Sequence, residues 1–295
     1  MSVRVVRFLE LTASEKQRID VLTKDASIYV QLEYCNALTQ GRFFIFVYGD
    51  FESFIYIPYR KKYGIVYAYR PVFYQQCVLV GNEKHYATLM DAVQRRIKYG
   101  DISLDRFKTN TTRTNYELNL NAPYETLRAN FSTNHKRNCN KAKHLHIEKV
   151  ATPETLIRLF VHEKEAVFSP GQLSEIKNAI HALAKAEPMQ TKLNHFVAFD
   201  GDTAVAATLF ITHNQRLYYL LGASLKNDPN HSSKGLFALF NHLIQHHAQT
   251  PTTLDFEGSD IPGIARFFKG FGAVKTHYYA LKWNKLPFPL NKLKS

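Results

Sequence analysis

The chain has 295 residues, of which 45% are hydrophobic and 21% charged, a composition typical of globular proteins that excludes fibrous and disordered classes. Its 38 lysines and arginines against 25 aspartates and glutamates give a formal net charge of +13. This charge favours a polyanionic partner, such as a nucleotide, a phosphorylated cofactor, RNA or an acidic membrane surface. A solvated basic surface without a specific partner explains it equally well.

The first part of the chain has the pattern of a small mixed domain. A strand-like start is followed by a polar helix over 15–23 and a second helix over 30–38. Aromatic and β-branched runs then predict an antiparallel meander, with strands over 43–48, 54–59, 65–69 and 73–80. An amphipathic helix over 83–98 is expected to end at Gly100 as its C-cap. Short strands over 102–107 and 115–120 complete this part.

From Pro123 onward the pattern changes to helices, so we place a domain boundary after residue 120 and expect domains 1–120 and 121–295. Asp200-Gly201 predicts a tight hairpin between two apolar strands. The order of elements predicts an α/β fold with a mixed sheet. Helices are expected over 124–130, 132–143, 153–168, 173–186, 235–248 and 261–269, and strands over 145–150, 195–200, 203–212, 216–222, 252–257 and 273–283.

An anion site is predicted where the strand over 216–222 leads through a polar loop to a helix that begins at Lys234-Gly235. The first backbone N–H groups of a helix lack intrahelical partners, and the helix dipole places positive charge there. Ser232 and Ser233 could cap the helix or donate to phosphate oxygens, and Gly235 would allow close backbone approach. A helix that is merely capped fits the same residues.

Two carboxylates follow each other in the segment from Leu254 to Asp260. Strand alternation predicts Leu254 and Phe256 in the core, with Asp255 and Glu257 on the opposite face about 7 Å apart. Either carboxylate could act as a general base toward an amine if burial raised its pKa. A solvated strand edge is an equally good interpretation.

A basic segment over 131–143 contains Lys136 and Arg137. Arginine suits bidentate binding of phosphate, so a phosphate or RNA contact is one hypothesis; a solvated helix face is the other.

His242 and His246 lie four residues apart but lack the glutamate of a zinc helix, so no metal site is expected. No GxGxxG, Walker or Gly-x-Ser-x-Gly motif occurs, which leaves dinucleotide-binding, kinase and serine-hydrolase interpretations without support.

Localisation is predicted from what the sequence lacks. No apolar run approaches the ~20 residues that cross a bilayer, and the first residues lack the small-residue cleavage site of a signal peptide. Cys35, Cys77 and Cys139 are odd in number and widely spaced, so we interpret them as reduced thiols. We therefore expect a cytoplasmic protein without a membrane span.

Four segments together resemble the GNAT superfamily, and most closely its Fem-type aminoacyltransferase branch with bacterial relatives. They are Tyr219-Leu-Leu-Gly-Ala-Ser, Ser233-Lys-Gly-Leu, Asp255-Phe-Glu-Gly-Ser and Arg266-Phe-Phe-Lys-Gly-Phe-Gly. Upstream, His135-Lys-Arg-Asn-Cys-Asn-Lys and Arg70-Pro-Val-Phe-Tyr-Gln-Gln are similar to earlier segments of that branch. The resemblance implies two GNAT-like domains in tandem, an acyl-CoA N-acyltransferase fold.

The resemblance also implies roles for particular residues. A backbone N–H near Leu221 and Gly222 would polarise the acyl carbonyl, and the pyrophosphate of coenzyme A would lie on Ser232, Ser233, Lys234 and Gly235. Glu257 or Asp255 is the expected base, and Tyr278 or Tyr219 the expected acid, since Phe267 or Phe268 replaces the tyrosine often found on the last helix. Candidates for acceptor contacts are Arg70, Tyr74 and Gln75, and candidates for a phosphate are Lys136 and Arg137.

We therefore predict an N-acyltransferase that moves an acyl group from acyl-CoA, in the first place acetyl-CoA, to a small-molecule or peptide amine bound between the two domains. The donor would be a co-substrate, with no tightly bound cofactor. One alternative is an aminoacyl-tRNA-dependent Fem-type transferase, with tRNA as a partner. Another is a non-catalytic GNAT-fold module that binds a nucleotide or RNA.

Overall fold

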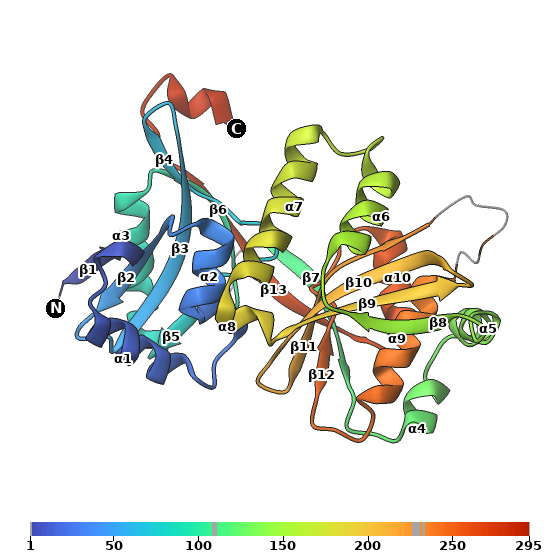
Figure 1. The fold of residues 1–295 in the computed structure, drawn as a ribbon. Helices are drawn as coiled ribbons and strands as arrows, with labels where there is room; N and C mark the ends of the chain where they lie inside the picture. The colour runs from blue at the N-terminus through green and yellow to red at the C-terminus, as the bar shows by residue number, and fades with distance from the viewer. Residues whose placement is uncertain (1, 108–110, 226–230, 232–233, 295) are drawn as a thin grey trace. The chain divides into compact units, whose positions relative to one another are not determined.

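A computed structural model describes residues 2–107, 111–225, 231 and 234–294 (Figure 1). The chain divides into two compact units: unit 1 is Met1–Arg113 with Tyr278–Ser295, and unit 2 is Thr114–His277. The chain enters unit 2 within β7 (Thr111–Asn119) and leaves it within β13 (Val274–Asn284). The boundary expected after residue 120 thus lies just past β7. Residues 278–295, expected in the second domain, group with unit 1 because β13 pairs there with β6 (Tyr99–Leu104).

Unit 1 has a sheet in the order β1-β2-β3-β4-β6-β13, and β5 pairs with β3. Its helix α1 begins at a capping box in which Thr12 accepts from the Glu15 N–H and Glu15 accepts from the Thr12 N–H. The elements are β1 (Val3–Arg7), α1 (Ala13–Thr23), α2 (Leu32–Thr39), β2 (Phe43–Tyr48), β3 (Ser53–Lys62), β4 (Ile65–Ala68), β5 (Leu79–Gly81), α3 (Tyr86–Arg96), β6 and the end of β13, with 3-10 turns at Phe8–Glu10, Ile28–Val30, Glu83–His85 and Leu290–Lys294.

Two sequence predictions for unit 1 are wrong. The strand expected over 73–80 is reduced to an isolated bridge at Cys77 and to β5; its first residue, Phe73, has a left-handed backbone (φ +63°) that a strand does not accommodate. Gly100 does not cap α3, which ends at Arg96; it lies within β6. A β-carbon at Gly100 would lie 2.3 Å from the Trp283 ring, so the glycine makes room for the indole.

Unit 2 has a mixed sheet in the order β7-β12-β11-β10-β9-β8, in which β11 and β12 are parallel and the other described pairs are antiparallel. The hairpin predicted at Asp200-Gly201 is confirmed: it joins β9 to β10, and Gly201 has a φ of +58°. The elements are α4 (Tyr124–Ala129), α5 (Thr133–Lys141), β8 (His146–Val150), α6 (Glu154–Lys164), α7 (Pro170–Lys185), α8 (Glu187–Gln190), β9 (Leu193–Asp200), β10 (Thr203–His213), β11 (Arg216–Ser224), α9 (Gly235–His246), β12 (Thr253–Asp255) and α10 (Pro262–Gly270).

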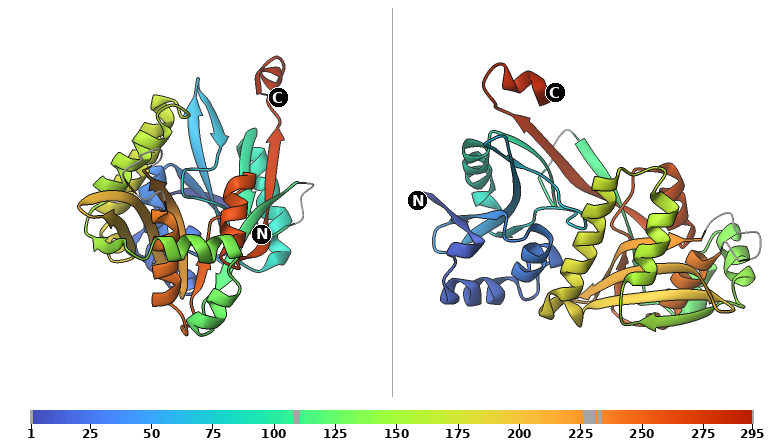
Figure 2. Two further views of the ribbon diagram at one scale, coloured as in Figure 1. Left: turned by 90° about the vertical axis from the view of Figure 1, so that its right-hand side faces the viewer. Right: turned by 45° about the horizontal axis from the view of Figure 1, so that its top comes forward.

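Helices cover both faces of the unit 2 sheet. On one face α6 packs against β10 and β11, with α7 beside it. On the other face α9 packs against β9, β10 and β11, and α10 lies on the same side (Figures 1 and 2). The layers are therefore helix, sheet, helix, which agrees with the predicted α/β architecture. Among the described residues, no helix has the length and apolar character to cross a membrane.

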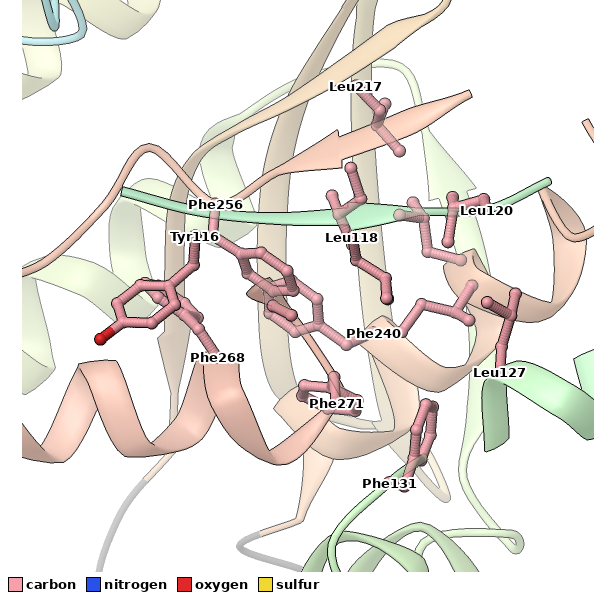
Figure 3. Packing of buried hydrophobic residues seen from close by; sticks show 14 of the residues in the cluster. Tyr116, Leu118, Leu120, Leu127, Phe131, Leu217, Phe240, Phe256, Phe268 and Phe271 are labelled. Atoms are coloured by element: carbon pink, nitrogen blue, oxygen red, sulfur yellow. The ribbon is translucent and has the colours of Figure 1, made fainter. Parts of the chain in front are cut away.

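An aromatic core fills the space between α9, α10 and the strands β7 and β12 (Figure 3). Phe240 of α9 stacks on Phe256 with ring centroids 5.4 Å apart, and Phe268 of α10 lies 4.6 Å from Phe256. Phe271 meets Phe131 edge-on at 5.2 Å. Burial of such rings stabilises each by about 1.5–3 kcal/mol, so the phenylalanines of the last helix are explained by packing.

Candidate functional site

Strands β11 and β12 separate after a short stretch of pairing. They pair at Arg216–Tyr218 with Thr253–Asp255, after which β12 ends, while β11 continues to Ser224. One edge of β11 is thus without β12 from Tyr219 onward. On that side, the described residues include no strand that pairs with β11 beyond Tyr218, and an edge of this kind can offer backbone N–H and C=O groups to a ligand.

The separation arises because the chain after β12 stays attached to β7. The Phe256 N–H donates to the Tyr116 carbonyl at 3.0 Å, and the Thr114 N–H donates to Asp260 Oδ1 at 3.2 Å. Gly258 has a φ of +69°, and a β-carbon there would lie 2.2 Å from the Thr114 carbonyl oxygen. The segment is therefore held against β7 and away from β11.

Alternation along β11 decides which N–H groups face the open edge. The Leu225 N–H donates to the Val205 carbonyl of β10 at 2.7 Å. Since consecutive residues of a strand point their N–H groups to opposite sides, Leu221 faces β10, whereas Gly222 and Ser224 face the open edge. The pairing register shifts opposite Leu209 and Phe210, so β11 has a bulge in this region. Of the two residues expected to polarise a carbonyl, Gly222 therefore has the right orientation.

The Tyr219 hydroxyl lies beside Gly222. The Tyr219 ring packs against Phe210 at 5.4 Å and Phe240 at 5.0 Å. A β-carbon at Gly222 would lie 2.3 Å from the Tyr219 hydroxyl oxygen. Burial raises the pKa of Tyr219 far above its ordinary value, and the negative charge of Glu163 adds to the rise. Tyr219 thus keeps its proton at neutral pH and can donate a hydrogen bond.

Glu163 of α6 is a site residue that sequence reasoning missed. Its side chain is 8% exposed, and its carboxylate accepts a hydrogen bond from the Ser224 N–H at 2.9 Å. The Lys164 ammonium lies 3.0 Å from its other oxygen. Nothing in the sequence signals this position, because a glutamate in an amphipathic helix is usually solvated and Ser224 is 61 residues away.

The start of α9 lies close to the same edge. A β-carbon at Gly222 would lie 3.2 Å from Leu236 Cδ2, in the first turn of the helix. Gly235 is required for packing, since a β-carbon there would lie 2.5 Å from that of Ala206 on β10. Lys234 occupies the N-cap position. Ser232 and Ser233, expected to hold a phosphate, lie outside the described residues, and the anion site at this helix start stays a prediction.

Asp255 occupies a structural position. It is 4% exposed, and it accepts from Arg216 at 2.8 Å, from Asn115 at 3.0 Å and from the Glu257 N–H at 2.9 Å. Burial raises the pKa of Asp255, and the Arg216 guanidinium opposes that rise. Arg216 also contacts Glu117 at 3.0 Å. A base role for Asp255 does not fit, because its oxygens are engaged within the protein.

Glu257 does not share a strand face with Asp255. β12 ends at Asp255, and Glu257 has a left-handed backbone with a φ of +59°. The hydrogen bond from the Glu257 N–H to the Asp255 carboxylate forms a turn of the Asx type. Leu254 and Phe256 are buried in the core as predicted. Glu257 is half-buried and stays a candidate base.

The basic segment of α5 forms local contacts. Lys136 Nζ donates to the Ala129 carbonyl at the end of α4 at 2.7 Å, and Arg137 is exposed and donates to Asn134 at 2.9 Å. A hollow of about 380 Å³ lies between α4 and α5, and Lys136 and Arg128 line it. A phosphate contact at Lys136 or Arg137 stays a prediction.

The remaining candidates belong to unit 1. Arg70 is exposed, with Nη1 3.4 Å from Ser103 Oγ, and Gln75 is buried. Tyr74 is 1% exposed and donates its hydroxyl hydrogen bond to the Tyr29 carbonyl at 2.8 Å. Contact with an acceptor therefore does not fit Tyr74. Tyr278, a candidate acid, is buried in the part of β13 that belongs to unit 1.

Within the described ranges, no three His, Cys, Asp or Glu side chains are placed to hold a metal ion. The rings of His242 and His246 lie side by side, 6.3 Å apart. Cys35, Cys77 and Cys139 are buried free thiols. Burial raises the pKa of Cys139 to about 11, which keeps its thiol protonated and unreactive.

Comparison with known proteins places the fold. No protein-family model matches the sequence, and no curated protein matches it. FemX matches with a TM-score of 0.67 and 11% identity over 100% of both chains. A tandem GNAT protein from the clavulanic acid biosynthesis pathway matches with a TM-score of 0.52 and 8% identity, over 95% of this chain and 98% of that one. The C-terminal domain of a putative lysylphosphatidylglycerol synthetase from Agrobacterium fabrum matches with a TM-score of 0.51 and 13% identity, over 92% of both. The chain therefore has the fold of FemX and of tandem GNAT proteins, as its sequence resemblance predicted.

Proposed function

We propose that the chain is an N-acyltransferase that moves an acyl group from a coenzyme A thioester, in the first place acetyl-CoA, to an amine. The observation that supports this most is the open edge of β11, where the Gly222 N–H faces away from β10. A fixed backbone N–H stabilises the oxyanion that forms when an amine attacks a carbonyl carbon. Loss of one such donor typically reduces kcat about 10²–10³-fold.

Two neighbouring groups suit the same reaction. The protonated Tyr219 hydroxyl, beside Gly222, can donate a hydrogen bond to the sulfur as the carbon–sulfur bond breaks. The start of α9, with Lys234 at its N-cap, offers backbone N–H groups and positive charge to the phosphates of the donor. Both lie beside the edge of β11, so one extended donor could contact all three.

A second donor class is favoured by the net charge of +13. A strongly basic protein attracts nucleic acid in a salt-dependent way, so aminoacyl-tRNA could supply the acyl group in place of acyl-CoA. The chemistry at Gly222 would be the same, because an ester carbonyl develops the same oxyanion. FemX and the lysylphosphatidylglycerol synthetase domain share the fold of this chain, and a shared fold does not select between the two donors.

Thiol release tests the proposal. Purified protein is incubated with acetyl-CoA and a panel of primary amines: amino acids, lysine-containing peptides and amino sugars. We expect amine-dependent release of free coenzyme A and a matching acetylated product by mass spectrometry. A parallel reaction uses aminoacylated tRNA at low and high salt. Transfer only from tRNA would replace the first donor with the second, and transfer from neither donor would favour a non-catalytic binding module.

A further inference from the structure

The carboxylate of Glu163 lies at the open edge of β11, although its helix α6 belongs to the layer on the opposite face from α9. Its oxygen is 2.9 Å from the Ser224 nitrogen, and Ser224 is two residues beyond Gly222 on the same edge. Only 8% of the side chain is exposed. A carboxylate this well buried is unusual unless it has donors or a function.

Glu163 and Tyr219 approach this edge from different sides of the sheet. The Tyr219 ring packs with Phe240 of α9 and Phe268 of α10, whereas Glu163 comes from α6. Glu163 contacts the Ser224 N–H on the same strand as Tyr219, and its charge contributes to the raised pKa of Tyr219. Along β11, Gly222 lies between Tyr219 and Ser224, the residue whose N–H donates to Glu163. A neutral donor and an anion therefore flank the group that would bind an oxyanion.

We propose that Glu163 is the proton acceptor of the transfer reaction, taking the proton from the amine nitrogen as that nitrogen attacks the acyl carbon. This inference rests on the proposed acyltransferase function and names the base that the function requires. The Ser224 N–H and the Lys164 ammonium both stabilise the charged carboxylate, which is the form that accepts a proton.

In the transfer step the nitrogen–carbon bond forms, and one nitrogen-bound proton passes to a Glu163 oxygen. The carbon–sulfur bond breaks with its electron pair on sulfur, while Tyr219 donates a hydrogen bond to that sulfur. The proton held by Glu163 then goes, directly or through water, to the thiolate, which leaves as the free thiol. Glu163 returns to its charged form without any further reagent.

Other carboxylates of the region fit this role less well. The oxygens of Asp255 are engaged by Arg216, Asn115 and the Glu257 N–H. Glu257 follows the end of β12, in the segment that is held to β7 and away from β11. Glu165 is on the same helix as Glu163 but is exposed. Among these carboxylates, Glu163 is the one that contacts the open edge of β11.

The test is the variant Glu163→Gln, with Glu165→Gln as its matched control. A glutamine oxygen can still accept from the Ser224 N–H, so the fold and the edge should be kept while the proton acceptor is lost. With acetyl-CoA and the fastest amine of the panel, we expect kcat to fall about 10²–10⁴-fold. The Kd for acetyl-CoA, measured by calorimetry, should change less than about twofold, and Glu165→Gln should match the wild type. Unchanged kcat in Glu163→Gln would overturn the assignment, even if Glu163→Ala lost activity, because Glu163 would then only position β11.

A second variant leaves the carboxylate in place. Lys164→Met removes the ammonium 3.0 Å from Glu163, so the acid limb of the kcat/KM profile should move to higher pH. An acid limb that does not move would contradict the proposal, and this result stands even if Glu163→Gln fails to fold.

If the wild type transfers an acyl group but both variants behave like it, the base assignment is wrong and the proposed function is kept. If the wild type, folded by circular dichroism, transfers no acyl group to any amine, the proposed function fails and the base assignment falls with it.

Discussion

The Tyr219 hydroxyl oxygen lies so close to Gly222 that a β-carbon on that glycine would come within 2.3 Å of it. A hydroxyl on one residue of β11 thus occupies the space that a side chain three residues later would need. Gly222 therefore has two roles. Its missing side chain leaves room for the Tyr219 hydroxyl, and its N–H faces the open edge of β11.

Gly222→Ala should therefore displace the Tyr219 hydroxyl. Overpacking of this kind costs about 1–3 kcal/mol, and the displaced hydroxyl should lower acetyl-CoA turnover. The double variant Tyr219→Phe/Gly222→Ala removes the clashing oxygen and should recover much of the stability but not the turnover. Urea unfolding and thiol release measure the two effects. Additive losses of stability in the double variant would show that the two residues do not compete for this space.

Asp255→Ala should destabilise unit 2. It leaves Arg216, whose side chain is 32% exposed, without its buried partner, and it removes the acceptor of the hydrogen bonds that the Asn115 amide and the Glu257 N–H donate to Asp255. Breaking a buried pair in this way costs about 3–5 kcal/mol. The exposed Asp202→Ala serves as the control, with an expected change within about 0.5 kcal/mol. Equal unfolding midpoints for the two variants in urea would rule out a structural role for Asp255.

Gly235→Ala should disturb the packing of α9 on β10, since the new methyl group would lie 2.5 Å from the Ala206 β-carbon. We expect a loss of about 1–3 kcal/mol. Gly263→Ala is the matched control, because Gly263 lies in the first turn of α10 with no atom within 4 Å of its added β-carbon. It should be neutral or stabilising by about 0.5–1 kcal/mol. A neutral Gly235→Ala would mean that α9 does not depend on this close approach.

His135 should make stability depend on pH. Its Nε2–H donates to the Phe267 carbonyl at 2.8 Å, and its Nδ1 accepts from the Ser132 hydroxyl at 2.9 Å. Burial lowers the pKa of His135, and the hydrogen bond to Phe267 opposes this. In the unfolded chain its pKa is about 6.5, so the unfolded state takes up the proton first as the pH falls.

The stability that the neutral His135 ring contributes is thus present above about pH 6.5 and is lost below it. Urea midpoints measured between pH 7.5 and pH 5.5 should fall more steeply for the wild type than for His135→Gln. The other histidines with lowered pKa values, His195, His242 and His247, titrate in both proteins and cancel in the comparison. Parallel midpoint curves would contradict the neutral, buried state of His135.

Local chemistry made several features predictable from sequence. Asp200-Gly201 specifies its hairpin because a glycine adopts a positive φ at no steric cost. Alternation placed Leu254 and Phe256 in the core correctly. It failed for Glu257, because the Asp255 carboxylate turns the chain by accepting the Glu257 N–H and the strand stops there. A strand pattern does not reveal where such a turn replaces the next strand residue.

The candidate site itself depends on contacts between distant segments. The resemblance pointed to Gly222 and Tyr219, but only the pairing of β10 with β11 shows that Gly222 and not Leu221 faces the open edge. Glu163 lies on a helix whose pattern is that of an ordinary amphipathic helix, and its partner Ser224 is brought near by the fold. The expected approach of Gly235 to a phosphate stays a prediction, and the room that its missing side chain makes for Ala206 is visible only in the fold.

The most direct test of the central claim is a crystal structure of the protein grown with saturating coenzyme A. If β11 presents the acyl-transfer site, the pantetheine arm will lie along its open edge, with a polar atom within hydrogen-bond distance of the Gly222 nitrogen and the phosphates at the start of α9. An unoccupied edge, or coenzyme A bound away from β11 and α9, would contradict the assignment of this edge as the acyl-CoA site.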